Sequence, residues 1–280
     1  MARVRVVTDS ACDLPAALAE EQGITVVPLS IRFGSEEFVD GATLSADDFW
    51  ARCAASPVLP ETAAPSPGAF QEAFLAAAHE GYDAVVCITI SSGVSGTHQS
   101  ARTAADSVKD RIRVLTVDSR TATMGQGLIV LDVAALAATG ASPEDIVARS
   151  EALIKKTQVF GAVDNLEHLE KGGRIGGAKA LLGTLLAIKP VLTVTDGIVG
   201  EESKQRTRSR SLRYLAGKAQ EAGPISRMAV CNGAATDIDD FLSMLDGVKS
   251  EHPMVVVDLG PVVGTHTGPG TIGLCLITAG

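Results

Sequence analysis

Hydrophobic residues in the first half of the chain form short continuous runs, and amphipathic segments separate these runs from one another. Continuous runs rich in β-branched residues are typical of strands that are buried on both faces. Such strands are predicted at 4–8, 24–33, 84–90 and 113–117. Helices are predicted to begin at Asp13, Ser45 and Ser142 and to cover 69–78, 96–108 and 122–138, and the proline-rich segment 56–68 is expected to be a loop.

The alternation of strands and helices indicates a three-layer α/β arrangement, in which helices cover both faces of a mainly parallel sheet. After about residue 156 the pattern changes, and Asp196-Gly197 is typical of a tight hairpin turn. Strands are predicted there at 159–163, 190–194, 228–231, 254–258 and 271–277, and helices at 166–171, at 180–188 and from within 204–213. We therefore predict two α/β domains, residues 1–156 with the parallel sheet and residues 157–280 with a mixed arrangement.

Composition restricts the classes of function. The chain has 280 residues, of which 46% are hydrophobic but only 4% are aromatic, so its core is expected to be aliphatic. A net charge of −9 without any basic block argues against binding to nucleic acid or to an anionic membrane. No transmembrane segment and no signal peptide are expected. The five cysteines are scattered and lack any C-x-x-C pair, which suggests a cytoplasmic protein in a reducing environment.

The segment after the predicted strand at 84–90 is the strongest candidate for chemistry. Ser91-Ser92-Gly93 interrupts the strand, and a helix is predicted to begin at Gly96-Thr97. This order of strand, hydroxyl-rich turn and helix start directs hydroxyl and backbone N–H groups to one point, where the helix adds partial positive charge. The segment therefore predicts a binding site for a carboxylate or a phosphate.

Three further segments carry polar groups in settings that suggest binding. Thr62 lies on a stiff loop beside prolines, and His266 lies in a turn just before the last predicted strand. Arg174 lies between two pairs of glycines, which favours an accessible side chain that contacts a partner. The alternative for His266 and for Arg174 is a purely structural role.

Several common motifs are absent. The chain has no G-x-G-x-x-G that follows a predicted strand, no Walker A loop and no paired-histidine spacing that suggests a metal site, so neither a cofactor nor a metal is expected. Two alternatives to simple binding stay open: a serine hydrolase with Ser92 as nucleophile and His266 as base, and a sensor of small phosphates. The chain lacks a G-x-S-x-G nucleophile elbow, which argues against the hydrolase. The sensor needs further cations, for which Arg174 and the basic segment 204–213 are the candidates.

Taken together, these segments resemble the DegV family of bacterial proteins over essentially the whole chain. The motifs that carry the resemblance follow in order: Val7-Thr8-Asp9-Ser10-x-x-Asp13-Leu14, Thr62 with Pro65-Ser66-Pro67, Ser91-Ser92-Gly93-x-Ser95-Gly96-Thr97, Leu169-x-Lys171-Gly172-Gly173-Arg174-Ile175, Ile188-Lys189-Pro190 and His266-x-Gly268-Pro269-Gly270. The resemblance implies a two-domain α/β protein that binds one long-chain fatty acid between its domains and has no catalytic residue of its own. It also implies a partner, an ATP-dependent fatty acid kinase that converts the bound carboxylate to an acyl phosphate.

Site residues are carried over from the matching motifs. The ligand-binding residues implied in this way are Thr62, Ser91, Ser92, Gly93, Arg206 and His266. Among them, the hydroxyl and imidazole groups are expected to surround the carboxylate, and Arg174 is expected to contact the kinase. The family usually has a serine directly after the threonine of the second motif, where this chain has Ala63. The acyl tail needs an apolar tunnel, and the aliphatic composition is suited to build one.

Overall fold

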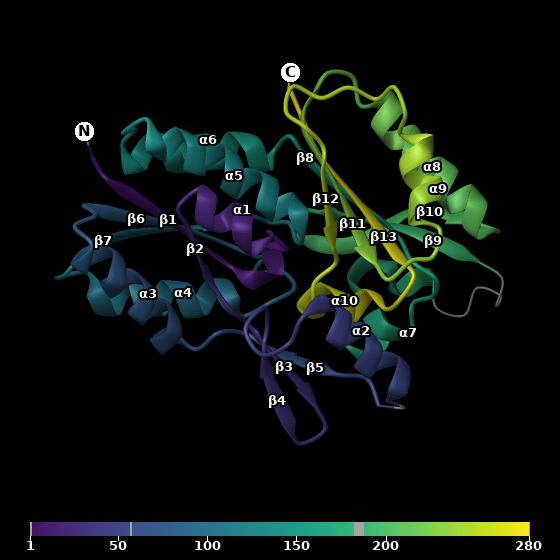
Figure 1. The fold of residues 1–280 in the computed structure, drawn as a ribbon, viewed down its shortest axis with the longest axis horizontal. Coiled ribbons are helices and arrows are strands. Elements are labelled where there is room, and N and C mark those ends of the chain that lie inside the picture. Colours follow the sequence, from purple (N-terminus) through teal and green to yellow (C-terminus); the bar gives the residue numbers. More distant parts are fainter. Residues whose placement is uncertain (1, 57, 182–187, 280) are drawn as a thin grey trace.

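Two sheets, one of four strands and one of six, form the framework of the protein (Figure 1). The computed structural model describes residues 2–56, 58–181 and 188–279. The first sheet uses strands from the first half of the chain, and the second uses strands between residues 157 and 278. The predicted α/β fold class, with a parallel sheet followed by a mixed one, is therefore confirmed.

The four-stranded sheet is entirely parallel. Its strands are, in spatial order, β2 (Ile24–Val27), β1 (Val4–Asp9), β6 (Ala84–Thr89) and β7 (Arg113–Asp118). Because side chains alternate between the two faces of a strand, Val86 and Ile88 pack against one pair of helices, while Val85 and Cys87 pack against the other. The first pair is α5 (Met124–Ala138) and α6 (Pro143–Ile154), and the second is α3 (Pro67–His79) and α4 (Thr97–Val108). Figure 1 shows the three layers.

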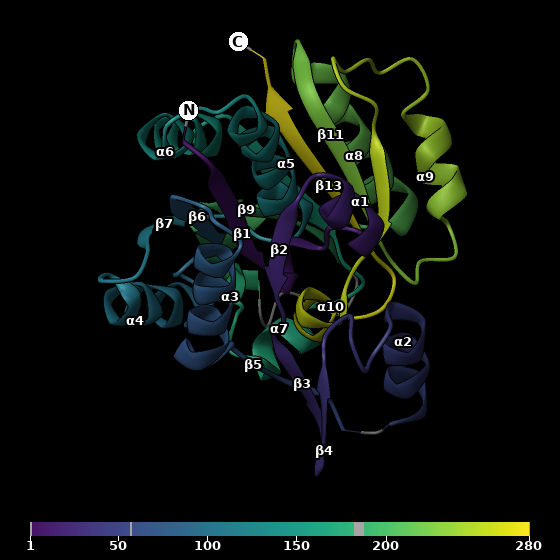
Figure 2. The same cartoon turned by 60° about the vertical axis from the view of Figure 1, so that its left-hand side comes forward.

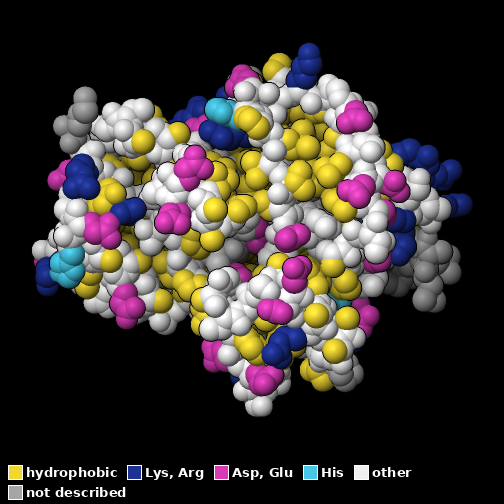
Figure 3. All heavy atoms as spheres, viewed as in Figure 1, with side chains coloured by type: hydrophobic (Ala, Val, Ile, Leu, Met, Phe, Trp, Pro, Cys, Tyr) yellow, Lys and Arg dark blue, Asp and Glu magenta, His cyan; other side chains and the backbone are white. Residues whose placement is uncertain are grey.

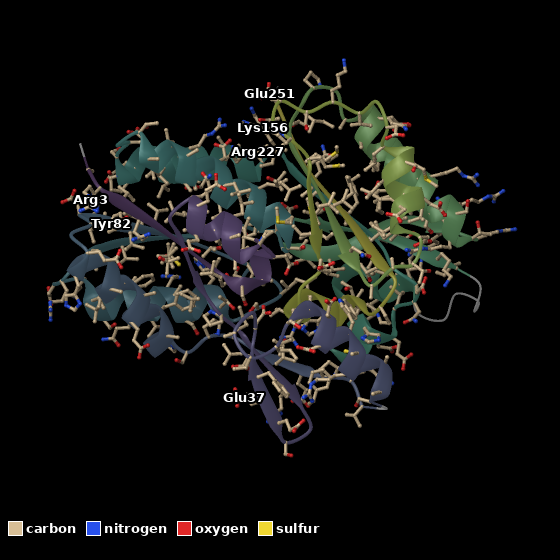
Figure 4. All side chains as sticks on the ribbon, in the orientation of Figure 1. Arg3, Glu37, Tyr82, Lys156, Arg227 and Glu251 are labelled. Atoms are coloured by element: carbon tan, nitrogen blue, oxygen red, sulfur yellow. The ribbon has the colours of Figure 1, made fainter. Side chains whose placement is uncertain are left out.

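The two ends of the parallel sheet differ in character. Near the amino ends, the guanidinium groups of Arg3 and Arg5 lie 4.6 Å and 4.2 Å from the centre of the Tyr82 ring. Figure 4 shows Arg3 and Tyr82 together at the edge of the molecule. At the carboxyl ends, β1 ends at the buried Asp9 and β7 ends at Asp118. Open parallel sheets bind their ligands beyond this carboxyl end.

The six-stranded sheet is antiparallel except for one parallel pair, β11 with β12. Its strands are, in spatial order, β10 (Ile198–Gln205), β9 (Lys189–Thr195), β8 (Thr157–Ala162), β13 (Thr271–Thr278), β11 (Ile225–Gly233) and β12 (Val255–Asp258). The hairpin predicted at Asp196-Gly197 joins β9 to β10, and both of its residues have positive φ, as a tight hairpin turn requires. Helices α8 (Arg208–Glu221) and α9 (Ile238–Met244) share one hydrophobic cluster with this sheet.

Helix α5 belongs to the cores of both sheets. It is buried along most of its length, and its side chains form one cluster with Ile88 of the first sheet and with Cys231 and Cys275 of the second. A helix that is hydrophobic on all sides is typical of such a position. The domain division between residues 156 and 157 stays a prediction, because this helix from the first half shares its core with the second half.

A third, small sheet was not expected from the sequence. Its antiparallel strands are, in spatial order, β4 (Glu36–Val39), β3 (Ser30–Phe33) and β5 (Glu61–Ala63). The hairpin of β3 and β4 projects from the rest of the molecule (Figure 2), and Glu37 lies on it (Figure 4). Two predictions are wrong here. The strand expected at 24–33 is divided at Pro28, which has no backbone N–H to donate, and the loop expected at 56–68 contains β5 and the start of α3.

The other helices that the structure describes are η1 (Ser10–Cys12), α1 (Ala16–Glu21), α2 (Ala46–Ala55), α7 (Glu167–Lys171), η2 (Gly176–Leu181) and α10 (Pro261–Thr267). His266, which was expected in a turn, lies in the last turn of α10. Asp13, which was expected to cap a helix start, instead ends η1 with a φ of 53°, and α1 begins after Pro15. The helix predicted at 180–188 lies mostly outside the described residues.

Candidate binding site

A cavity of about 210 Å³ lies where the carboxyl ends of the parallel sheet approach the six-stranded sheet. Its wall is formed by residues 94–96 before α4, the start of α5, helix α10 and strands β8 and β9. Aliphatic side chains make up most of this wall, among them Leu29, Ile90, Leu192 and Val262. A concave, mostly aliphatic wall with few polar groups is typical of a site for an apolar or amphipathic small molecule.

Thr62 and His266 meet at the wall of this cavity. The hydroxyl oxygen of Thr62 lies 3.0 Å from Nε2 of His266. Strand β5 presents Thr62 opposite Ile31 of β3, and the last turn of α10 presents His266. The other ring nitrogen, Nδ1, is buried against Gly172 and has no hydrogen-bond partner in the described part of the chain. The structure thus brings together two of the residues selected from the sequence.

The imidazole of His266 is neutral at neutral pH. Its pKa is lowered from 6.5 to about 4, first by burial and then by the nearby positive charges of Arg174 and His168. A neutral imidazole carries a proton on only one ring nitrogen. Nε2 therefore either donates to the Thr62 hydroxyl or accepts from it, depending on the tautomer.

Arg174 lines the same cavity. Its Nε donates to the backbone oxygen of Val94 at 3.2 Å, and its Nη1 donates to that of Gly172 at 2.7 Å. The side chain is half-buried rather than freely accessible. The flanking glycines explain why, because Gly173 and Gly176 adopt positive φ and let the loop fold back onto the site. A contact between Arg174 and a kinase stays a prediction.

The turn after β6 is held against the hairpin between β9 and β10. Ser91 Oγ donates to the backbone oxygen of Gly197 at 2.7 Å, and a Cβ added at Gly93 would lie 2.5 Å from the same oxygen. Ser92 points elsewhere, since both its hydroxyl and its backbone N–H donate to the carboxylate of Asp118. None of the three residues of this turn contributes to the described wall of the cavity.

Ser95 and Gly96, which come later in the same motif, do line the cavity. Gly96 is the N-cap of α4, so the positive end of that helix dipole lies at the wall. The hydroxyl of Ser95 lies 2.8 Å from the hydroxyl of Thr97. Sequence reasoning selected Ser92 instead, because the motif contains several hydroxyls and only the geometry of the turn distinguishes them.

Arg206 lies apart from the cavity. It is exposed between β10 and α8 and is absent from the described wall. Lysine and arginine side chains gather on this side of the molecule beside α8 (Figure 3). The nearby Arg208 is paired with Asp237 at 2.9 Å. The structure therefore does not bring Arg206 together with Thr62 and His266.

Neither a metal site nor a membrane-spanning helix is found in residues 2–56, 58–181 and 188–279, which the structure describes. No group of three or more histidine, cysteine, aspartate or glutamate side chains in these ranges is arranged to hold a metal ion. In the same ranges, no helix has both the length and the apolar character needed to cross a membrane. All five cysteines are free thiols.

The fold and the cavity define an α/β protein with two large sheets, a small third sheet and an internal, mostly aliphatic cavity. The chain belongs to the DegV family, because the family model described as "Uncharacterised protein, DegV family" matches residues 3–279. A DegV domain-containing protein of Halalkalibacterium halodurans is 36% identical over 278 residues, which cover 98% of each chain. The resemblance inferred from the motifs is confirmed.

Solved structures of relatives share this fold along the whole chain. A DegV family protein from Thermus thermophilus, described as fatty acid binding, is 33% identical with a TM-score of 0.88 and covers 99% of each chain. A protein from Eubacterium ventriosum, described as binding a fatty acid, stearic acid, is 30% identical with a TM-score of 0.86. The match covers 99% of this chain and 98% of that one.

Proposed function

We propose that this protein binds one long-chain fatty acid without converting it chemically. The acyl tail occupies the aliphatic cavity, and the carboxylate lies beside Thr62, Ser95, Arg174 and His266. The observation that carries this proposal is the combination of an aliphatic wall with these few polar groups in one cavity. The relatives described as binding fatty acids support the same class of ligand.

The tail supplies most of the binding free energy in this proposal. Each methylene group transferred from water to an apolar wall contributes about 0.8 kcal/mol. Affinity should therefore increase with the length of the acyl chain until the cavity is full. Butyrate, which has the same carboxylate but a very short tail, should bind far more weakly than palmitate.

The head group is oriented by several weak donors rather than by one strong pair. The hydroxyls of Thr62 and Ser95 can donate to a carboxylate, and the N-terminus of α4 and Arg174 supply positive charge beside it. The neutral imidazole of His266 can add one N–H donor. In this arrangement Ser95 takes the role that the sequence suggested for Ser92.

We further propose that the bound acid is presented to a separate ATP-dependent fatty acid kinase in the cytoplasm. The serine hydrolase alternative is disfavoured, because the Ser92 hydroxyl is bonded to Asp118 and His266 to Thr62, so that the two do not form a nucleophile–base pair. A histidine with a pKa of about 4 is also a weak base at neutral pH. The phosphate-sensor alternative is disfavoured because Arg174 is the one cation on the described cavity wall.

Native mass spectrometry of the freshly purified protein tests the ligand class. We expect a species heavier than the bare chain by the mass of one long-chain fatty acid, and we expect denaturation to release it. A protein that carries no acyl ligand and does not bind added palmitate would contradict the proposal.

The kinase role is tested with Arg174→Ala in two assays on one preparation. The first assay measures palmitate affinity, and the second measures acyl phosphate formation by an added fatty acid kinase. Because Arg174 also lies beside the proposed carboxylate position, palmitate affinity should fall in either case; if Arg174 contacts the kinase as well, acyl phosphate formation stays below the wild-type rate even when palmitate is saturating. If Arg174 serves the lipid alone, acyl phosphate formation returns to the wild-type rate once palmitate is saturating.

A further inference from the structure

Asp13 connects two parts of the fatty acid cavity, although it lies outside that cavity. It is 9% exposed and lines a separate pocket between α1, the segment before α2 and β12. Its Oδ1 accepts a hydrogen bond from the backbone N–H of Gly260 at 3.2 Å, and its Oδ2 accepts one from the hydroxyl of Thr123 at 2.6 Å. One buried carboxyl group thereby contacts two elements that form the cavity wall.

The first of these elements is α10, the helix that carries His266. Gly260 is its N-cap, and a Cβ added at Gly260 would lie 2.5 Å from Oδ1 of Asp13. The Asp13 carboxyl group thus fills the space that a side chain at 260 would need. Leu259 and Val262, on either side of this contact, line the cavity. Because α10 has only seven residues, a displacement at its first turn is transmitted directly to His266 in its last.

The second element is the start of α5. Thr123 is the N-cap of α5 and lines the cavity, with φ of 49° and ψ of −145°. Residues other than glycine rarely adopt this conformation, and it costs free energy. The Thr123 hydroxyl makes no bond to its own helix and donates to Asp13 instead. The bond to Asp13 therefore helps to hold Thr123, and with it this part of the wall, in place.

We infer that Asp13 is a positioning residue: through Gly260 and α10 it fixes the placement of His266, and it thereby sets the preference of the site for a carboxylate over an uncharged head group. This inference rests on the proposed function. It differs from a general role in stability, because it predicts a loss of head-group discrimination and not merely a loss of folded protein.

Two variants disturb the contact from opposite sides. Asp13→Gly removes both acceptors and keeps the backbone unstrained, since glycine readily adopts the φ of 53° at this position. Gly260→Ala places a methyl group against Oδ1 of Asp13, and the φ of −67° at 260 is suitable for alanine. Asp40→Gly is the matched control. Asp40 is also 9% exposed and lines the same separate pocket, but its side chain interacts with Ser10 and not with Gly260 or Thr123.

The experiment measures the affinities of palmitate and of hexadecanol, which has the same tail and an uncharged head group. Wild type and Asp40→Gly should prefer palmitate. In Asp13→Gly and Gly260→Ala, the ratio of the two affinities should fall about tenfold, the equivalent of one lost hydrogen bond to a charged group. An unchanged ratio, or an equal loss for both ligands, would overturn the inference. If wild type binds neither ligand, the proposed function itself has failed, and this outcome is distinct from the others. Should Asp13→Gly not fold, Gly260→Ala alone decides.

Discussion

The hydroxyl of Thr62 lies 3.0 Å from Nε2 of His266, although 204 residues separate the two in the chain. Each residue reaches this contact on a short element, Thr62 on a three-residue strand and His266 on a seven-residue helix. Neither element is long enough to be stable by itself, so the contact depends on the packing of the small sheet against α10. Such a contact is suited to respond to a ligand beside it.

Replacing Thr62 by valine tests this contact. The change keeps the shape of the side chain and removes the hydroxyl, which leaves Nε2 of His266 without a protein partner. We expect palmitate affinity to fall about ten- to a hundredfold, or about 1.5–3 kcal/mol, as is usual for a lost hydrogen bond to a charged group. Titration with palmitate measures the effect. Thr25→Val in β2, where Thr25 is not part of the described cavity wall, is the control and should keep wild-type affinity.

Ser92 and Ser95 should differ when each is replaced by alanine. Ser95 lines the cavity, whereas the hydroxyl of Ser92 is bonded to Asp118. We therefore expect Ser95→Ala to weaken palmitate binding about tenfold and Ser92→Ala to leave it within about twofold of wild type. The same titration measures both. The opposite order of effects would restore the assignment made from the sequence.

The serine pair also shows what the sequence could and could not predict. Strands β1, β6 and β7 were predictable because buried parallel strands are continuous hydrophobic runs, and their polar ends indicated the side of the sheet that holds the site. Which hydroxyl of the motif faces inward depends on the backbone dihedral angles of the turn. Those angles follow from the contact between the turn and the hairpin at Gly197, which is distant in sequence.

The small sheet was missed for a different physical reason. Strand β5 has three residues and lies among prolines, so it has no periodicity that a sequence pattern can show. It forms because β3 offers a backbone partner, which is a tertiary effect. Arg206 was carried over from the family resemblance, and nothing in this sequence distinguishes a basic residue that faces solvent from one that faces a site.

The acid stability of the protein should reflect His266. Its pKa is about 4 in the folded protein and 6.5 without the protein environment, so the folded state binds fewer protons than the unfolded state between these pH values. Stability from this group is therefore lost as the pH falls below 6.5, by about 3 kcal/mol in total once the pH is below 4. Asp9 and Asp40 act in the opposite direction, because burial raises their pKa to about 6 and the folded state takes up protons first.

A comparison of wild type with His266→Gln isolates the histidine, since the contributions of Asp9 and Asp40 are the same in both proteins. Urea unfolding at a series of pH values from neutral to acidic gives the free energy of unfolding of each. We expect wild type to lose stability relative to the variant as the pH falls through this range. Parallel curves would show that His266 titrates normally. Arg174→Met should make this loss of stability smaller and end it at a higher pH, because removing the charge of Arg174 raises the pKa of His266 in the folded protein toward its value in the unfolded chain.

Adding one methyl group at two different glycines should change stability in opposite directions. A Cβ at Gly93 would lie 2.5 Å from the backbone oxygen of Gly197 and 3.3 Å from Cγ1 of Ile198, so Gly93→Ala must push the β9–β10 hairpin away from the turn after β6. We expect the free energy of unfolding to fall by about 1–3 kcal/mol, as is usual when an extra group is forced into a packed site. Gly217 lies inside α8, and apart from the backbone of this helix no atom lies within 4 Å of its added Cβ. Gly217→Ala should therefore raise the free energy of unfolding by about 0.5–1 kcal/mol, because alanine restricts the conformations of the unfolded chain. Chemical unfolding measures both variants under the same conditions. A Gly93→Ala variant as stable as wild type would mean that the hairpin is not held against the turn, and the wall that Val194 and Val199 of this hairpin contribute to the cavity would then lack its support.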